Sequence, residues 1–328
     1  MMQRRLFRFS FFWMFPLVSG FALASPLSLE KTNVQSVHAG FKHEAIYGLC
    51  VDESKAIAVG EAGLILSSAD GGDTWIKSER FSEVALLDVE CGRGVELYVG
   101  QSGEIYRLTD GTVEAVSTDS DARLMSVAHS HAAGLTVAVG AFGTILVSAD
   151  GGGSWSSSIV DWFAVLDDYV DPHLYDVDIS EQGVVTIVGE FSLVLQSVDQ
   201  GQSWITRQRG EPSLFGLNIN SSGIGYAVGQ EGTLLSTSDA GTSWTPIKTP
   251  TTDILLNVTS LNDGLIVATG MRQLIFSVDG GAHWSLSRSP AFAEGWYQGL
   301  EVSPKSEIGA SIIFVAGHRA NILKLELQ

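Results

Sequence analysis

Residues 135–155, LTVAVGAFGTILVSADGGGSW, contain the most regular part of a pattern that recurs along the chain. A short apolar run ends in Gly140, a second apolar run follows a tight turn, and an Asp-Gly turn leads to Trp155. The spacing is about 40 residues, which indicates one unit of short strands copied seven times. The equivalent glycines are Gly60, Gly100, Gly140, Gly189, Gly229, Gly270 and Gly317.

A complete copy, such as the third, holds four short strands and three turns, which is the content of one propeller blade. The runs are apolar on both faces, as expected when each blade packs between two neighbours. We therefore predict an all-β fold, a seven-bladed β-propeller with four antiparallel strands per blade. The last copy stops one strand short, and a spare strand at residues 33–37 precedes the first copy. This N-terminal strand is expected to complete the last blade and close the ring.

The N-terminus is typical of a secretory signal peptide. Arg4, Arg5 and Arg8 precede an apolar run over residues 9–24, and Ala22-Leu23-Ala24 is a small-x-small cleavage site. We expect residues 1–24 to be removed and residues 25–328 to form a single propeller domain, periplasmic or secreted. The pair Arg4-Arg5 leaves twin-arginine export open beside the general route.

The chain has 19 basic and 37 acidic residues, a net charge of −18. Without the three signal arginines the balance is 16 against 37, or −21. This charge opposes binding to nucleic acid and to anionic lipid, because both depend on pairing phosphates with Lys and Arg. It allows a basic partner, or simply favours solubility.

Five turns share the signature S/T-x-D-x-G-x-x-W. We expect each to be a hairpin between strands three and four, in which the Asp accepts turn N–H groups, Gly takes a positive φ and Trp packs on the blade. Identical residues spread around a ring cannot converge on one catalytic or metal site, so their role is structural. The pairs are Asp70 and Trp75, Asp150 and Trp155, Asp199 and Trp204, Asp239 and Trp244, and Asp279 and Trp284.

The signature resembles the Asp-box, or BNR repeat, of sialidases and many bacterial propellers. The longer pattern around it resembles the Ycf48/HCF136 family of photosystem II assembly factors and their relatives in non-photosynthetic bacteria. This resemblance covers essentially the whole chain after residue 24 and implies a non-catalytic assembly or stability factor. Photosynthetic members are described as binding a reaction-centre precursor through an arginine-rich surface. Here the arginines lie at scattered strand and turn positions: Arg80, Arg93, Arg107, Arg123, Arg207, Arg209, Arg272, Arg288 and Arg319.

The usual binding site of a propeller is the central mouth, lined by the turns between strands two and three and by the links between blades. The turns place Glu61, Glu190 and Glu231 near Arg272 and Arg319 on neighbouring blades, which predicts either a charged rim for a partner or solvated turn residues. No cofactor or metal is expected, because neither a phosphate-binding loop nor a calcium-loop spacing is present. A group at Asp167, Asp168 and Asp171 lacks that spacing, and His129 and His131 fall in a turn on the opposite face.

Two long links between blades, at residues 161–173 and 289–298, carry aromatic and acidic residues. Such a composition is common at protein interfaces, so these links are predicted to bind a protein partner of an envelope or membrane complex, with the chain itself a monomer. The alternative is that Trp162, Phe163, Phe292 and Trp296 fold down and plug the channel. The candidate partner-binding residues on the links are Trp162, Asp167, Asp168, Tyr169, Trp296 and Tyr297.

The alternative function is a carbohydrate-active enzyme, a sialidase-like glycoside hydrolase. A sialidase needs three convergent arginines, a Tyr nucleophile with a Glu partner, and an acid Asp. The predicted mouth supplies Arg272 and Arg319, with Tyr169 or Tyr297 as remote nucleophiles. We therefore favour a non-enzymatic protein.

Cys50 and Cys91 are the two cysteines, on the first strands of blades one and two. Their opposite parity in the aligned strands lets them point toward each other or both away. Export permits a disulfide, whereas inner strands of adjacent blades are often too far apart for one. Both outcomes stay open at this point.

Overall fold

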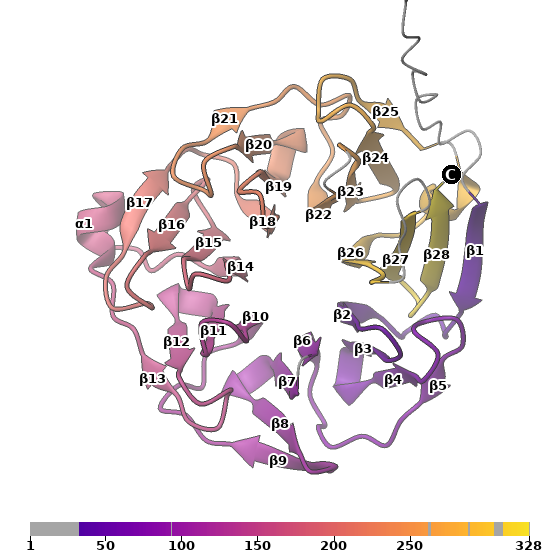
Figure 1. Ribbon diagram of the computed structural model, residues 1–328, viewed down its shortest axis with the longest axis horizontal. Helices are drawn as coiled ribbons and strands as arrows, with labels where there is room; N and C mark the ends of the chain where they lie inside the picture. The colour runs from indigo at the N-terminus through magenta and orange to yellow at the C-terminus, as the bar shows by residue number, and fades with distance from the viewer. Residues whose placement is uncertain (1–32, 93, 262–263, 288, 305–310, 328) are drawn as a thin grey trace, which may run out of the picture.

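The structure is a computed structural model that describes residues 33–92, 94–261, 264–287, 289–304 and 311–327. These residues form seven four-stranded antiparallel sheets, which Figure 1 shows as blades around a central channel. The prediction of an all-β, seven-bladed propeller is confirmed. The predicted signal peptide, residues 1–24, lies outside the described residues.

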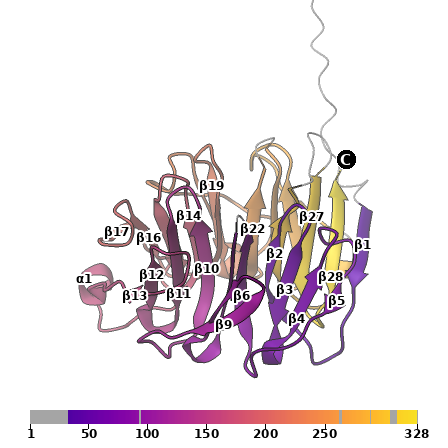
Figure 2. The ribbon, with the colours of Figure 1, turned by 60° about the horizontal axis from the view of Figure 1, so that its bottom comes forward.

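Within a blade the strands follow one another from the channel to the rim, and Figure 2 shows that they stand side by side through the depth of the ring. Blade one contains β2 (Ile46–Val51), β3 (Ala56–Gly60), β4 (Ile65–Ser68) and β5 (Ile76–Lys77), and blade two contains β6 (Leu86–Gly92), β7 (Val95–Gly100), β8 (Ile105–Thr109) and β9 (Thr112–Val116). Blade three contains β10 (Leu124–Ser130), β11 (Leu135–Gly140), β12 (Ile145–Ser148) and β13 (Ser156–Ser157), and blade four contains β14 (Leu174–Ile179), β15 (Val185–Gly189), β16 (Val194–Ser197) and β17 (Ile205–Gln208). Blade five contains β18 (Leu214–Ile219), β19 (Gly225–Gly229), β20 (Leu234–Thr237) and β21 (Thr245–Pro246), and blade six contains β22 (Leu255–Ser260), β23 (Ile266–Gly270), β24 (Gln273–Ser277) and β25 (Ser285–Leu286).

Short helices occupy the turns and the two long links. They are α1 (Trp162–Leu166), η2 (Glu61–Gly63), η3 (Gln101–Gly103), η4 (Ala141–Gly143), η5 (Gln230–Gly232) and η6 (Pro290–Phe292). No helix in the described part of the chain is long and apolar enough to cross a membrane.

The seventh blade joins the two ends of the chain. It contains β26 (Tyr297–Val302), β27 (Ser311–Gly317) and β28 (Ile322–Leu327), and β1 (Asn33–His38) is its outermost strand. β1 pairs antiparallel with β28, with Val34 opposite Leu325. The predicted closure by an N-terminal strand is confirmed, and Figure 1 shows the first and last strands side by side at the right of the ring.

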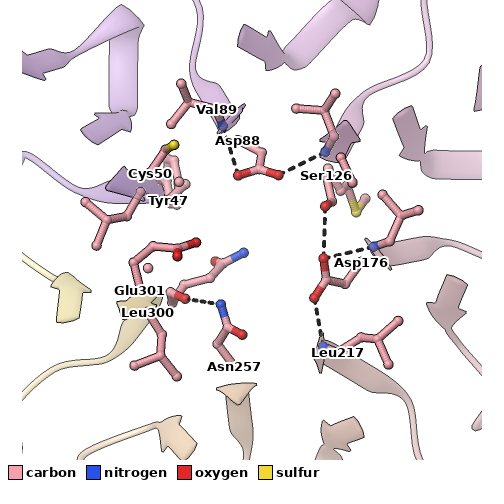
Figure 3. A pocket seen from close by; sticks show the side chains of 18 of the residues that line it. Tyr47, Cys50, Asp88, Val89, Ser126, Asp176, Leu217, Asn257, Leu300 and Glu301 are labelled. Atoms are coloured by element: carbon pink, nitrogen blue, oxygen red, sulfur yellow. Dashed lines mark hydrogen bonds between the residues drawn. The ribbon is translucent and has the colours of Figure 1, made fainter. Parts of the chain in front are cut away.

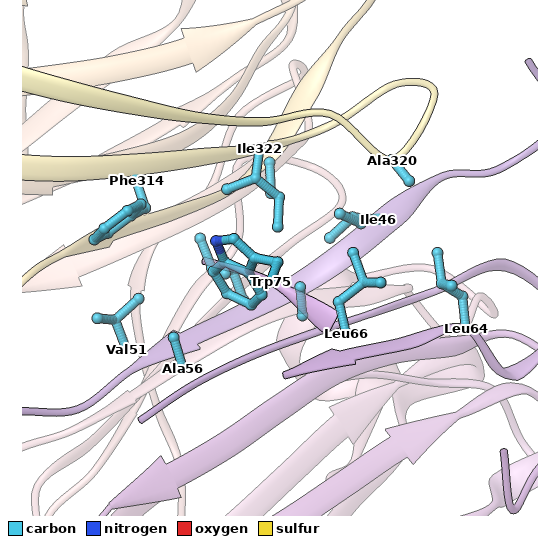
Figure 4. Close-up of a cluster of buried hydrophobic side chains, with 12 residues drawn as sticks. Ile46, Val51, Ala56, Leu64, Leu66, Trp75, Phe314, Ala320 and Ile322 are labelled. Carbon is cyan, nitrogen blue, oxygen red and sulfur yellow. The ribbon is translucent and has the colours of Figure 1, made fainter. Parts of the chain in front are cut away.

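The core lies between neighbouring blades because both faces of each sheet are apolar. Figure 4 shows one such cluster at the seam between blades one and seven, where Trp75 and Leu66 lie near Phe314 and Ile322. Phe314 is 1% exposed and Trp75 is 9% exposed. The hairpin glycine Gly72 has a φ of +98°, and a Cβ there would lie 2.5 Å from the Phe314 ring. This position therefore requires glycine.

The hairpins before the fourth strands have the expected geometry. In the first, the Asp70 carboxylate accepts the Thr74 N–H at 2.9 Å, and the Trp75 indole N–H donates to the Gly72 carbonyl at 2.9 Å. The hydroxyl of Ser68 donates to Asp70 at 2.7 Å. These bonds stabilise the ionised form and hold the pKa of the carboxyl well below its usual range. The equivalent residues Asp150, Asp199, Asp239 and Asp279 each have a pKa lowered to about 2 by hydrogen bonds of the same hairpin.

The structure joins Cys50 and Cys91 by a disulfide, with their Cα atoms 5.8 Å apart. The two residues lie on β2 and β6, the innermost strands of blades one and two. These strands approach each other because the blades converge on the channel. Closing the 41-residue separation stabilises the fold by about 4 kcal/mol in the chain-entropy account.

Candidate functional site

The first strand of every blade carries a β-bulge near its start. In β6 the pairing with β7 shifts between Leu86 and Asp88, and the other six first strands shift at the same place. A bulge adds one residue to a strand, so two consecutive side chains can face the same side of the sheet. In six of the seven first strands the second and third residues therefore both line the channel, and in all seven the fifth residue lines it below them; the exception is the third residue of β18, Gly216.

The second residues form what we call the mouth layer, one residue from each blade. They surround a recess of about 320 Å³, and six of the seven are apolar or aromatic. Gln101 and Arg123 line the same recess from its edge. The mouth layer consists of Tyr47, Leu87, Met125, Tyr175, Phe215, Leu256 and Gln298.

The third and fifth residues form the interior of the channel, a space of about 350 Å³ with polar walls. Five carboxyl groups lie here, contributed by blades two, four and seven, and we call them the channel carboxyls. They are Asp88, Glu90, Asp176, Asp178 and Glu301. Figure 3 shows Asp88, Asp176 and Glu301 pointing into the same space from three sides.

Most channel carboxyls join one blade to the next. Asp88 accepts the N–H of Val89 on its own strand and the N–H of Val127 on the next blade, each at 2.9 Å. Asp176 accepts the Leu217 N–H of the next blade at 2.8 Å and the hydroxyl of Ser126 at 2.9 Å. Each first strand is an edge strand, and these carboxylates satisfy its otherwise unpaired N–H groups.

The lower channel carboxyls repeat this arrangement with one exception. Glu90 accepts the His129 N–H at 3.2 Å, and Asp178 accepts the Ile219 N–H at 3.3 Å. Glu301 lies between Asp88 and Asn257 in Figure 3, and no dashed line reaches it. Among the described residues its carboxylate therefore has no hydrogen-bond partner.

Enclosure in the channel raises the pKa of every channel carboxyl, since burial penalises the charged form. The pKa is about 6 for Asp88 and for Asp178, about 7 for Asp176 and about 8 for Glu90, where the charge of Asp88 adds to the effect of burial. Burial and the charges of Glu90, Asp88 and Asp176 raise the pKa of Glu301 well above its ordinary value.

We expect the free energy of unfolding to be largest near pH 4 and to fall by about 3 kcal/mol or more by pH 8. The unfolded chain releases the protons of the channel carboxyls near pH 4 and the folded chain only at about pH 6 to 8, so stability is lost as pH rises between these values. One pKa unit corresponds to about 1.4 kcal/mol. Burial lowers the pKa of His38 and His129, which acts in the opposite sense below about pH 6.5. Urea unfolding across pH 3 to 9 measures the profile.

Below about pH 4 the profile is expected to fall again, because the hairpin aspartates have lowered pKa values and lose their hydrogen bonds on protonation. The variant Glu301→Gln removes one enclosed charge and is expected to be more stable than the wild type at pH 8. Stability that rises steadily from pH 5 to pH 8 would contradict this account of the channel.

Of the predicted site residues, Glu61 and Trp296 meet at the mouth. The Tyr47 hydroxyl donates to the Glu61 carboxylate at 2.7 Å, and the Tyr47 ring stacks on Trp296 with centroids 5.7 Å apart. Burial, and to a smaller extent the Glu61 carboxylate, raise the pKa of the Tyr47 hydroxyl to about 12. This part of the rim is therefore built from blades one and seven.

The other long link lies at the outer edge of the ring, where Figure 1 shows α1 beyond blades three and four. Trp162 packs inward on the η4 turn, since a Cβ at Gly143 would lie 2.2 Å from its indole nitrogen. Phe163 and Tyr169 are exposed, with ring centroids 4.7 Å apart. Asp167 and Asp168, which lie between these two residues in the sequence, are also exposed.

The charged turn residues are spread around the rim. Glu231, Arg272 and Arg319 are exposed at three different turns. Glu190 instead accepts the His173 N–H at 2.8 Å and so fastens the link between blades three and four. The structure thus brings the predicted rim residues to one face but not to one cluster.

One predicted partner-binding residue has to be corrected. Tyr297 is 2% exposed, and its hydroxyl donates to the Ala291 carbonyl at 2.8 Å, so it belongs to the core of blade seven. Tyr297 is the first residue of its strand, and the side chain at this position is buried in the core in all seven blades. Phe292 is 1% exposed in the same cluster. Phe292 is therefore part of the core and does not plug the channel.

The geometry offers little to a sialidase mechanism. Among the described residues, Arg123 is the one arginine that lines the mouth. Of the two tyrosines considered as nucleophiles, Tyr169 lies on the outer link and Tyr297 is buried. Within the described ranges no group of three or more His, Cys, Asp or Glu side chains is placed to hold a metal ion.

The mouth layer and the channel carboxyls were missed in the sequence. Aligning the seven first strands would have placed these residues in register, since they recur at fixed positions after each first core residue. Simple alternation of apolar and polar residues does not reveal them, because the bulge puts two neighbours on the same side.

The fold and the mouth define this chain as a seven-bladed β-propeller with an open central channel. No protein-family model and no curated protein matches the sequence. Its fold is similar to that of YCF48 from Cyanidioschyzon merolae, with a TM-score of 0.72 and 16% identity over 89% of this chain and 98% of that one. A YCF48 bound to D1 peptide gives a TM-score of 0.69 and 15% identity over 92% and 97%. The RRP9 WD40 repeats give 0.70 and 12% over 93% and 99%.

Proposed function

We propose that this chain is an exported, non-catalytic propeller that binds a protein partner through the face carrying the mouth layer. In this role it assists the assembly or stability of an envelope or membrane complex. The observation that carries the proposal is the mouth layer itself, a recess with six apolar or aromatic side chains out of seven. Exposed apolar recesses with a polar rim are common at protein interfaces.

Three further observations support the proposal. The N-terminal sequence is typical of a secretory signal, and a disulfide is stable in an oxidising compartment. The similar folds include a YCF48 bound to D1 peptide, which is a propeller holding a polypeptide. The arginines of this chain are too scattered to repeat an arginine-rich surface, so we propose a partner other than a photosystem precursor.

The test is capture of one partner by the purified chain from envelope extracts of the source cell. We expect the double variant Tyr175→Ser/Phe215→Ser, which makes the mouth polar, to lose that partner. The control Ile76→Ser changes a side chain that is 68% exposed on the outermost strand β5 and is expected to retain it. Equal capture by both variants would overturn the proposal. Robust turnover of fluorogenic glycosides by the purified chain would also overturn it.

A further inference from the structure

The channel has an apolar entrance and an anionic interior, arranged one below the other. The mouth layer surrounds the entrance, and the same seven residues also line the top of the interior space. A ligand that enters therefore meets aromatic and aliphatic side chains first and carboxyl groups afterwards. This order of chemistry matches an alkyl stem that ends in a positive charge.

Glu301 differs from the other channel carboxyls because it has no structural partner. Both oxygens of Asp88 are occupied by backbone N–H groups, and both oxygens of Asp176 are occupied as well. The Glu301 side chain is half-buried in the channel, where the charges of Glu90, Asp88 and Asp176 act on it and no cation lies beside it among the described residues. A carboxyl withdrawn from bulk water without a hydrogen bond from the protein is available to a ligand that satisfies it.

We propose that the channel receives a lysine side chain of a partner protein, with the alkyl stem against the mouth layer and the ammonium group at Glu301. This inference rests on the proposed function, because it names what the mouth recognises. The ammonium carries three donors; Glu301 can accept one of them, and Glu90, whose charge acts on Glu301, lines the same space.

The charge of the surroundings supports a cationic ligand. The chain carries a net charge of −18, and five of its carboxyls gather in this one channel. Low-dielectric walls focus such a field and attract the opposite charge. Arg123 at the edge of the mouth acts in the opposite direction, so Arg123→Gln is expected to strengthen binding of a cation.

The first experiment uses n-pentylamine as the probe, because its five carbons and its ammonium group correspond to the Cα atom and side chain of lysine. Isothermal titration calorimetry on the whole purified chain at pH 7.5 is expected to show binding at least tenfold tighter than that of n-pentanol. Binding is also expected to release protons into the buffer, since the enclosed carboxyl gives up its proton when the cation arrives. Two buffers with different ionisation enthalpies measure that release. Equal affinity for pentanol would overturn the inference.

Variants then locate the site. We expect Glu301→Gln to weaken pentylamine binding at least tenfold and to abolish the proton release. The matched control is Glu181→Gln, the same change at an exposed turn residue, which is expected to bind like the wild type. Asp178→Asn provides a second channel variant with a weaker expected loss if Glu301→Gln folds poorly. Binding that is unchanged in both channel variants would overturn the inference.

The last step distinguishes a protein lysine from other cations. A peptide Ac-Gly-Lys-Gly-NH2 is expected to bind at least tenfold tighter than its norleucine counterpart, whereas spermidine or Ca²⁺ binding without lysine-peptide binding would overturn the inference. If the peptide fails while the mouth variant still loses its partner, the inference is wrong and the proposed function stands. If the peptide binds but partner capture does not depend on the mouth, the proposed function is wrong, and this inference loses its source of lysine.

Discussion

Deleting β1, residues 33–38, is expected to open the ring and to lower the melting temperature by about 10 °C or more. β1 is the outermost strand of blade seven, and its pairing with β28 is the backbone ladder that ties the N-terminal strand to the C-terminal strand. Without it, β28 becomes an exposed edge and Val34 no longer packs on the core of that blade. Differential scanning calorimetry of the wild type and the deletion measures the loss.

Complementation provides the control for this deletion. A synthetic peptide with the sequence NVQSVH is expected to restore part of the lost melting temperature, because it can take the place of β1 against β28. A peptide with the same residues in scrambled order is expected to have no effect, since its side chains would no longer alternate between the two faces as those of β1 do. A deletion that melts like the wild type would show that closure by β1 contributes little.

The variant Phe314→Ala is expected to lower the free energy of unfolding by about 3–5 kcal/mol. Phe314 lies on β27 at the seam between blades seven and one, and its ring contacts the hairpin at Gly72. Its removal leaves a cavity that the rigid blades on either side cannot fill, and Trp75 loses a neighbour in the same cluster. Urea unfolding at pH 5 measures the change.

Phe41→Ala is the matched control, since it makes the same chemical change at a side chain that is 78% exposed. Its effect is expected to stay within about 0.5 kcal/mol. Equal losses in the two variants would mean that the seam between the first and last blades does not carry the stability that its burial indicates.

The blades could be predicted from the sequence because their information is local. Each copy of about 40 residues contains its own strands, turns and hairpin, so Gly140, Asp150 and Trp155 have equivalents at fixed distances along the chain. The spare strand at residues 33–37 also follows from counting, since the last copy is one strand short. Repetition thus determines the number of blades and the way in which the ring closes.

The site could be predicted only in part. Glu61 and Trp296 lie on the predicted face and meet at Tyr47. Tyr297, one residue after Trp296, is buried instead, because it is the first core residue of its strand. A difference of one position in a strand reverses the direction of a side chain, and a link of uncertain length leaves that position open.

The amino-acid sequence by itself determined that seven similar sheets form and that the two ends of the chain share one of them. Only the tertiary structure decided what the centre of the ring contains. Asp88, Asp176 and Glu301 are separated by most of the chain, and they face one another because the blades converge and a bulge turns their strands. The chemistry of the channel is therefore a property of the closed ring, since no single blade contains it.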